Sequence, residues 1–131
     1  MKNQVSLLMI LLILSGIQIS SAQIKMNANQ FDSLLSKNKF VQLIDVRTPG
    51  EVSSGYIKGA VNINYSDPDF IKKINALDKT KPVAVYCAAG GRSGMSALKL
   101  KELGFTQIYD FTTGMTEWKA KNKPVETGSK R

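Results

Sequence analysis

The segment VAVYCAAGGRSGMSALKLKELG, residues 83–104, combines three features that together indicate one structural unit. Its first four residues are an apolar run, which predicts a buried strand that ends at Cys87. Small residues occupy positions 88–91, and a helix is predicted after Arg92 and Ser93, ending at Gly104. The segment therefore predicts a strand, a tight loop and a helix, with a thiol at the carboxyl end of the strand.

The surroundings of Cys87 favour a reactive thiolate. The backbone N–H groups of the loop and the N-terminus of the following helix carry positive partial charge. Such a field lowers the pKa of a thiol and stabilises the thiolate, which is its nucleophilic form. A buried, inert cysteine is the alternative, because free cysteines are often buried in protein cores. The Gly-Gly-Arg-Ser sequence at residues 90–93 favours the reactive thiol.

The numbers of cysteines and histidines exclude several kinds of site. The chain has one cysteine and no histidine. One cysteine cannot form an intrachain disulfide, so a disulfide-stabilised scaffold is excluded. Without imidazole there is no Cys–His catalytic pair and no zinc site that requires histidine. We therefore expect neither a metal nor an organic cofactor.

Residues 1–22 have the pattern of a secretory signal peptide. Lys2 supplies a positive charge, residues 5–14 are almost wholly apolar, and residues 20–22 are small and precede a cleavage site before Gln23. A membrane anchor is the alternative, but the apolar run is shorter than the roughly 20 residues that a spanning helix needs. We therefore expect export to the periplasm or the exterior, without stable membrane insertion after cleavage.

Cleavage at this point leaves 109 of the 131 residues, enough for one domain with a single core. We place the domain at residues 23–125 and expect residues 126–131 to be a disordered tail. The formal net charge of +8 becomes +7, since Lys2 is the only charged residue removed. The basic residues are scattered and no nucleic-acid recognition motif is present. The charge therefore indicates a solvated surface that attracts anionic substrates, and no nucleic-acid partner is expected.

Predicted strands and helices alternate along the domain. Strands are expected at residues 23–26, 40–44, 60–63, 83–86 and within 105–109. Helices are expected after Asn27 or Asn29, at residues 51–54, from Asp67 with Pro68 at the first helical position, after Arg92, and at residues 114–121. This alternation predicts an α/β fold with a central parallel sheet and helices on both faces. Ligands of such sheets bind at the carboxyl ends of strands, where Asp45 and Cys87 are predicted to lie.

Apolar spacing within two of the helices predicts which residues are buried. In the helix that follows Arg92, the residues expected to face the core are Met95, Leu98 and Leu103. In the helix that begins near Asp67, they are Phe70, Ile71, Ile74 and Leu77. The order of the strands in the sheet does not follow from these patterns.

Three segments, in order, resemble the signatures of one known family, the single-domain rhodanese sulfurtransferases. They are LIDVRTPGE at residues 43–51, GYIKGAVNI at 55–63 and CAAGGRS at 87–93, which resembles the family's active-site loop. A fourth segment, GMTEW at 114–118, resembles the family's terminal Gly-Trp element. The resemblance covers roughly residues 27–125. Tyr56 and Lys58 depart from the second signature, which commonly has histidine and proline at these positions.

The resemblance implies a transfer of sulfane sulfur in two steps. Cys87 would attack the outer sulfur of a small donor such as thiosulfate and become a persulfide. A thiophilic acceptor, either cyanide or a thiol, including a thiol of a partner protein, would then remove that sulfur. Backbone N–H groups would stabilise the charged sulfur, and Arg92 would bind or steer an anionic donor. The residues expected to contact the substrate are Ala88, Ala89, Gly90, Gly91, Arg92 and Ser93.

Asp45, Arg47 and Glu51 are expected to support the site structurally. Arg47 is predicted to pair with Glu51, and Asp45 is a candidate partner for Arg92 in an ion pair. Both expectations rest on charge and on position in the sequence.

Three other functions remain open at the level of the sequence. A cysteine phosphatase is disfavoured, because four residues separate Cys87 from Arg92, whereas a phosphate cradle has five. A sulfur carrier that is loaded by a partner protein is suggested by Ala88 and Ala89, which offer no charge to a small anion. A structural or regulatory domain with a vestigial cysteine is opposed by the intact cysteine, arginine and glycines.

Overall fold

The computed structural model describes residue 16 and residues 22–128. The predicted signal peptide, residues 1–22, lies outside the described residues except for Gly16 and Ala22. In the described part of the chain, the strands are β1 (Ala22–Met26), β2 (Gln42–Asp45), β3 (Val61–Asn62), β4 (Val83–Tyr86) and β5 (Gln107–Phe111). The helices are α2 (Ala28–Lys37), α3 (Pro49–Ser53), α4 (Phe70–Asn75), α5 (Gly91–Glu102) and α6 (Gly114–Ala120). None of the described helices is both long and apolar enough to cross a membrane.

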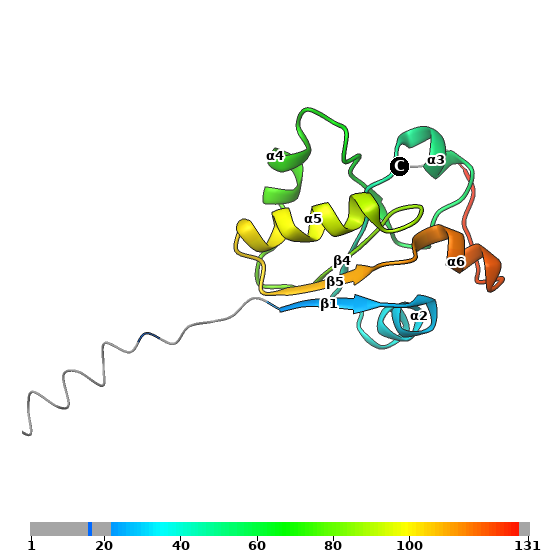
Figure 1. The fold of residues 1–131 in the computed structure, drawn as a ribbon, viewed down its shortest axis with the longest axis horizontal. Helices are drawn as coiled ribbons and strands as arrows, with labels where there is room; N and C mark the ends of the chain where they lie inside the picture. The colour runs from blue at the N-terminus through cyan, green and yellow to red at the C-terminus, as the bar shows by residue number, and fades with distance from the viewer. Residues whose placement is uncertain (1–15, 17–21, 129–131) are drawn as a thin grey trace, which may run out of the picture.

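The strands form one parallel sheet in the order β1-β5-β4-β2-β3. Figure 1 labels three of these strands, β1, β5 and β4. The predicted α/β class with a parallel sheet is confirmed. The sheet places β4 between β2 and β5, and all four of its residues are buried. An apolar run without alternation is typical of a strand covered on both faces, which explains why VAVY is continuous. The carboxyl end of β4 therefore lies at the middle of the carboxyl edge of the sheet.

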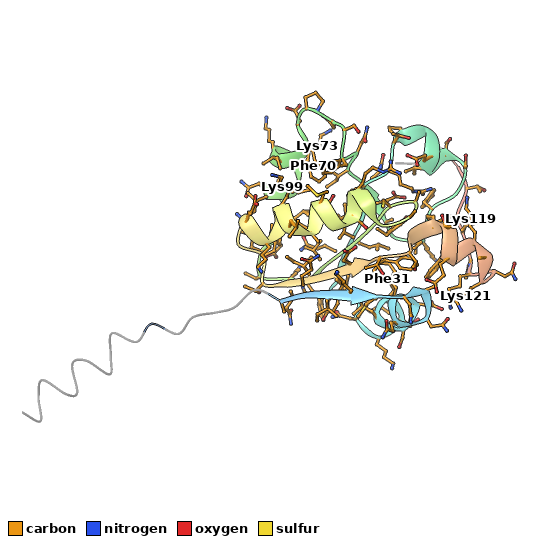
Figure 2. All side chains as sticks on the ribbon, in the orientation of Figure 1. Phe31, Phe70, Lys73, Lys99, Lys119 and Lys121 are labelled. Carbon is orange, nitrogen blue, oxygen red and sulfur yellow. The ribbon has the colours of Figure 1, made fainter. Side chains whose placement is uncertain are left out.

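Helices cover both faces of the sheet, and each face has its own core. On one face, α4 and α5 pack against Val83 and Val85 of β4 and against Ile108 of β5. On the other face, α2 and α6 pack against Ala84 and Tyr86. Figure 2 shows Phe31 between the sheet and α2, on the side opposite to α5. Residues of β4 alternate between the two cores, as the two-residue period of a strand requires.

The first helix begins where the sequence predicts a cap. The side chain of Asn27 accepts a hydrogen bond from the Gln30 N–H, and the Gln30 side chain accepts one from the Asn27 N–H. This capping box satisfies two N–H groups at the helix start that would otherwise lack partners. Of the two predicted caps, Asn27 is confirmed.

Several local predictions are wrong. Pro68 is in a turn before α4, which has its N-cap at Asp69, and Ile71 of that helix is exposed. In α5, Met95 and Leu98 are exposed, and the buried residues are Ser93, Ser96, Ala97 and Leu100. The apolar spacing of α5 is misleading because its buried face carries two serines and an alanine. These small residues let the helix lie close to the sheet.

The folded region extends beyond residue 125. Glu126 forms an antiparallel bridge with Tyr56, with hydrogen bonds of 3.0 Å from Tyr56 N and 2.8 Å from Glu126 N. The prediction of a disordered tail from residue 126 is therefore wrong at its first residue. Residues 129–131 lie outside the described part of the chain.

Candidate active site

Cys87 is the residue that directly follows β4, so the sheet presents its thiol at the carboxyl edge. The chain then turns sharply at Gly90, which has φ of +101° and is the N-cap of α5. A Cβ atom on Gly90 would lie 1.9 Å from the carbonyl oxygen of Thr112, so only glycine fits there. The loop after β5 therefore packs directly against the loop after β4.

The N-terminus of α6 holds the carbonyl groups of the cysteine loop. Met115 N donates to Cys87 O at 2.9 Å, and Thr116 N donates to Ala88 O at 3.0 Å. A Cβ atom on Gly114, which has φ of +55°, would lie 2.3 Å from Cys87 O. Because these carbonyls face α6, the N–H groups that follow in the loop are free to turn towards the sulfur.

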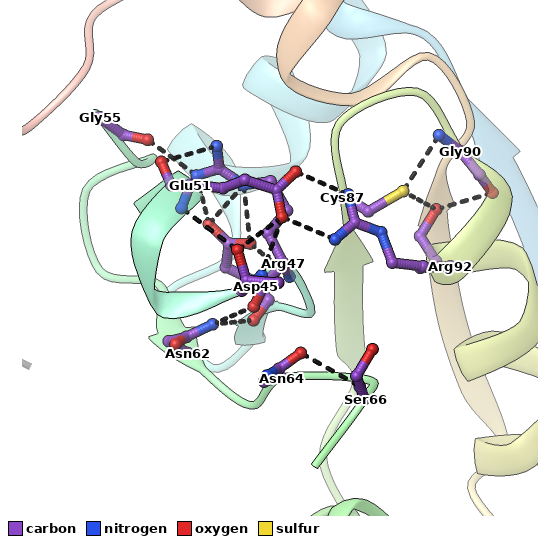
Figure 3. A network of polar contacts seen from close by, with 12 residues as sticks. Asp45, Arg47, Glu51, Gly55, Asn62, Asn64, Ser66, Cys87, Gly90 and Arg92 are labelled. Atoms are coloured by element: carbon purple, nitrogen blue, oxygen red, sulfur yellow. Dashed lines mark hydrogen bonds and ion pairs between the residues drawn. The ribbon is translucent and has the colours of Figure 1, made fainter. Parts of the chain in front are cut away.

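The sulfur atom lies in a cradle of hydrogen-bond donors. Gly90 N donates to Sγ of Cys87 at 3.1 Å, and Sγ lies 3.6 Å from Oγ of Ser93 (Figure 3). Burial alone would raise the pKa of the Cys87 thiol. Hydrogen bonds from the backbone of Ser93, Gly90 and Ala89 and from the Ser93 side chain outweigh burial and lower that pKa. The predicted convergence of N–H groups on the thiol is therefore present.

Cys87 itself is covered, since only 1% of the residue is exposed. It belongs to the core on the α4 and α5 face, together with Val85 and Ala97. The arrangement differs from an open anion site, because solvent reaches the loop at Ala89 and Gly91 but not the sulfur.

Arg92 is committed to an ion pair. Its Nη1 and Nη2 atoms donate to Oε2 and Oε1 of Glu51 at 2.7 and 2.8 Å, a bidentate arrangement (Figure 3). Hydrogen bonding to Arg92 lowers the pKa of Glu51, and the same bond raises the pKa of Arg92. The negative charge of Cys87 also raises the pKa of Arg92. The partner predicted for Arg92, Asp45, is therefore wrong, and the guanidinium bridges α5 to α3.

Arg47 pairs with Asp45 and not with the carboxylate of Glu51. Arg47 Nη2 lies 2.6 Å from Asp45 Oδ2, and both side chains are buried. The guanidinium also donates to the carbonyl oxygens of Gly55, at 2.7 Å, and Glu51, at 3.3 Å. Asp45 and Arg47 thus tie the end of β2 to α3 and to the loop that follows it. The prediction that they are structural agrees with this geometry, but the predicted pairing does not.

The described structure divides the six predicted loop residues into two groups. Ala89, Gly90 and Ser93 hydrogen-bond to the sulfur, and the carbonyl of Ala88 faces α6 instead. Arg92 points towards Glu51, and Gly91 begins α5 as an exposed residue. Among the described residues, no group of three or more acidic, cysteine or histidine side chains could hold a metal ion.

The sequence patterns missed Asp110, which is buried on β5 beside the N-terminal turn of α5. One signal could have revealed it, because a charged residue interrupts the otherwise apolar run from Ile108 to Phe111. They also missed Tyr86, whose hydroxyl accepts a hydrogen bond from Ile57 N at 3.0 Å. Burial and the nearby Asp45 carboxylate raise the pKa of Tyr86, so the phenol stays neutral.

Comparisons with known proteins agree with this geometry. The family model of the rhodanese-like domain matches residues 27–121. The Bacillus subtilis protein YqhL is 42% identical over 82 residues, which are 63% of this chain and 64% of that protein. Chloroplastic thiosulfate sulfurtransferase 16 of Arabidopsis thaliana is 30% identical over an alignment of 105 residues, and the match covers 72% of this chain and 85% of that protein. A rhodanese-related protein from Thermoplasma volcanium superposes with a TM-score of 0.71 at 30% identity, over 80% of this chain and 99% of that structure.

Proposed function

Since the chain belongs to the rhodanese-like family, we propose that it is a sulfurtransferase that carries sulfane sulfur as a persulfide on Cys87. The observation that supports this most directly is the 3.1 Å hydrogen bond from Gly90 N to Sγ. A backbone donor at this distance stabilises an anionic sulfur before and after the second sulfur is attached. The lowered pKa of the thiol acts in the same direction, because it increases the thiolate fraction at neutral pH.

The proposed reaction conserves charge in each step. The Cys87 thiolate attacks the outer sulfur of thiosulfate and forms a new S–S bond. The original bond to sulfur breaks, and sulfite leaves with the electron pair. Cyanide or an acceptor thiolate then attacks the outer sulfur of the persulfide anion, and the Cys87 thiolate leaves as it was. Neither step needs an oxidant or a metal.

Access to the sulfur requires a local movement of the protein. Because only 1% of Cys87 is exposed, a donor reaches Sγ only when the structure that covers it opens. The Arg92–Glu51 pair is partly exposed and links two different elements, so it can separate more easily than the buried Asp45–Arg47 pair. An anionic donor that replaces the Glu51 carboxylate on Arg92 would gain a bidentate partner.

The decisive experiment measures intact mass after incubation with sulfur donors. The wild-type protein is expected to gain one sulfur atom from thiosulfate or polysulfide and to lose it on addition of cyanide or a thiol. Cys87→Ser is the control and gains nothing. If no donor, including a loaded partner protein, attaches sulfur to the wild-type protein, the proposal is wrong.

A sulfur carrier that serves a partner protein is the second candidate. The specific observation that favours it is the bidentate Glu51 carboxylate on Arg92, which leaves this arginine without free charge for a small dianion. A carrier would show slow turnover of free thiosulfate and fast loading by a partner persulfide. Fast turnover of thiosulfate with cyanide would exclude this candidate in favour of the first.

We also propose that the protein is exported and that residues 1–22 are removed. The charged start, apolar segment and small residues before Gln23 support this proposal. Cleavage there would remove the first residue of β1 and its 2.9 Å hydrogen bond from Ala22 N to Thr106 O. N-terminal sequencing of the protein from the producing cells tests the proposal. An intact N-terminus and a purely cytoplasmic location would contradict it.

A further inference from the structure

Helix α5 turns two large apolar side chains to solvent and small side chains to the sheet. Met95 is 47% exposed and Leu98 is 46% exposed, whereas Ser96 and Ala97 are buried. The Ser96 hydroxyl donates to Arg92 O at 2.7 Å, so the polar group on the inner face is satisfied within the helix. A surface helix usually turns its apolar side to the core. Neighbouring apolar side chains on the outer side are instead typical of an interaction surface.

The two exposed side chains lie in line with the loop that covers the sulfur. Gly91, Met95 and Leu98 are four and three positions apart, so they share one face of α5. With a rise of about 1.5 Å per residue, this face extends about 10 Å from Gly91 to Leu98. Gly91 and Ala89 are exposed, and Gly90 between them donates its N–H to the sulfur at 3.1 Å. The α5 stripe, defined as Gly91, Met95 and Leu98, therefore begins at the loop that holds the reactive atom.

Basic side chains flank the α5 stripe. The helical repeat places Arg92 and Lys99 along one side of it and Lys101 along the other. Lys101 is exposed, as is 40% of the Lys99 side chain. Glu102 is the single acidic residue of α5, and its Oε2 atom lies 3.7 Å from Lys99 Nζ. The strand β1, which contacts α5, adds the exposed Lys25. The surface around the stripe is therefore net positive and complementary to acidic side chains.

We propose that the α5 stripe and the basic side chains around it are the docking surface for a partner protein that exchanges sulfur with Cys87. Such a partner presents an apolar patch surrounded by acidic side chains, with its reactive thiol at one end of the patch. This inference rests on the proposed function and identifies the sulfur acceptor by its chemistry. In the docked pair, the partner thiolate attacks the outer sulfur of the Cys87 persulfide anion and forms a new S–S bond. The S–S bond to Cys87 breaks, the Cys87 thiolate leaves with the electron pair, and the partner becomes the persulfide anion.

The chemistry of this surface favours a partner protein over other occupants. A small anion gains nothing from the apolar side chains of Met95 and Leu98. A second copy of this chain would place the same basic side chains against each other in a two-fold interface, and the chain already has a net charge of +8. A membrane is disfavoured because Leu100, the remaining large apolar side chain of α5, is buried in the core. The helix therefore has only a small apolar face to insert into lipid.

The test compares acceptors for sulfur that is carried on Cys87. The protein is loaded with sulfur from polysulfide, and intact mass follows the loss of that sulfur to each acceptor. One acceptor is 2-mercaptoethanol. The others are two synthetic helical peptides with a leucine stripe and a terminal cysteine, one with glutamate and one with lysine at the remaining positions. The wild-type protein is expected to transfer sulfur to the acidic peptide about tenfold faster than to the basic peptide, because only the acidic peptide complements the surface.

The double variant Met95→Gln/Leu98→Gln is expected to lower the ratio of the acidic-peptide rate to the 2-mercaptoethanol rate about tenfold, since both apolar contacts with the peptide are lost. Lys101→Glu should reduce the preference for the acidic peptide over the basic one. Phe40→Gln is the matched control, because Phe40 is 73% exposed and precedes β2 at the amino edge of the sheet, opposite to Cys87. It should keep the wild-type ratio. An unchanged ratio in the double variant overturns the proposed docking surface.

A second measurement needs neither a persulfide nor a variant. Amide NMR of the wild-type protein follows a titration with the acidic peptide in which serine replaces the cysteine. Shifts centred on Ala89, Gly91, Met95 and Leu98 support the proposal, and shifts centred elsewhere overturn it. The proposal is also overturned if these amides respond to self-association or to phosphatidylglycerol vesicles and not to the peptide. Failure to load sulfur onto Cys87 would instead reject the proposed function, and the titration would still decide whether the surface binds an acidic partner.

Discussion

At the scale of the single residue, the Glu51 side chain takes part in two different interactions, a helix cap and an ion pair. Its carboxylate completes the capping box of α3 with Thr48, and it also holds Arg92 in a bidentate ion pair. The first interaction needs only an oxygen acceptor, which glutamine also has. The second needs a negative charge. A change that separates the two interactions therefore shows whether Arg92 becomes available to an anionic donor.

Glu51→Gln is expected to lower the KM for thiosulfate about threefold to tenfold, because the partly exposed ion pair that competes with the donor is weakened. The stability of α3 should change little, since glutamine retains the cap. The measurement is steady-state sulfur transfer to cyanide over a range of thiosulfate concentrations. Glu102→Gln, at an exposed pair with Lys99, is the control. An unchanged KM in Glu51→Gln would show that Arg92 does not bind the donor.

Asp110 makes stability depend on pH with a sign that can be worked out. Burial raises the pKa of Asp110, so the folded state binds this proton more tightly than the unfolded state does. Its contribution to stability is therefore present in acid and lost as the pH rises through the folded pKa. Asp110→Asn is expected to raise the free energy of unfolding at neutral pH by about 1–3 kcal/mol. Below about pH 4, where the unfolded carboxyl is also protonated, the difference should vanish. Urea unfolding over this pH range measures the effect, and a difference independent of pH would contradict it.

The loop between β4 and α5 depends on glycine at one position and not at the next. At Gly90 the positive φ and the nearby Thr112 carbonyl both exclude a side chain. At Gly91 nothing lies within 4 Å of a Cβ atom. Adjacent glycines in one loop thus differ in what they contribute, although the sequence presents them as a pair.

Gly90→Ala is expected to destabilise the domain by about 3 kcal/mol or more, since the loop must move and the backbone becomes strained. The displaced Gly90 N–H would also leave the sulfur, so the pKa of Cys87 should rise. Gly91→Ala serves as the control for folding and should retain wild-type stability, because alanine is favoured over glycine in a helix. Thermal unfolding and thiol titration measure the two effects. Equal stability of both variants would show that the loop adapts to a Cβ atom at residue 90.

At the scale of the whole molecule, the segment after α6 packs against the loop that follows α3. Trp118 Nε1 donates to Pro124 O at 2.9 Å, and Glu126 forms two backbone hydrogen bonds with Tyr56. Tyr56 follows α3, whose residue Glu51 holds Arg92. The segment after α6 therefore supports the side of the site that α3 and its loop provide.

A chain that ends at Lys123 is expected to lose about 2–4 kcal/mol of stability, because three hydrogen bonds disappear. Glu126→Ala in the full chain is the control, since it keeps both backbone hydrogen bonds with Tyr56. Urea unfolding measures both variants. If the truncated chain is as stable as the control, the contacts of residues 124–126 do not contribute to the fold.

Local patterns in the sequence were sufficient for the α/β class, for most of the elements and for the position of Cys87. These features act over a few residues, so they can be recognised from the sequence alone: an apolar run such as VAVY, a cap such as Asn27 and a glycine-rich loop. Other features depend on which distant segments become neighbours. The partner of Arg92, the buried face of α5 and the approach of Asp110 to Gly94 follow from the strand order β1-β5-β4-β2-β3. That order is set by the packing of both cores, and no single stretch of residues encodes it.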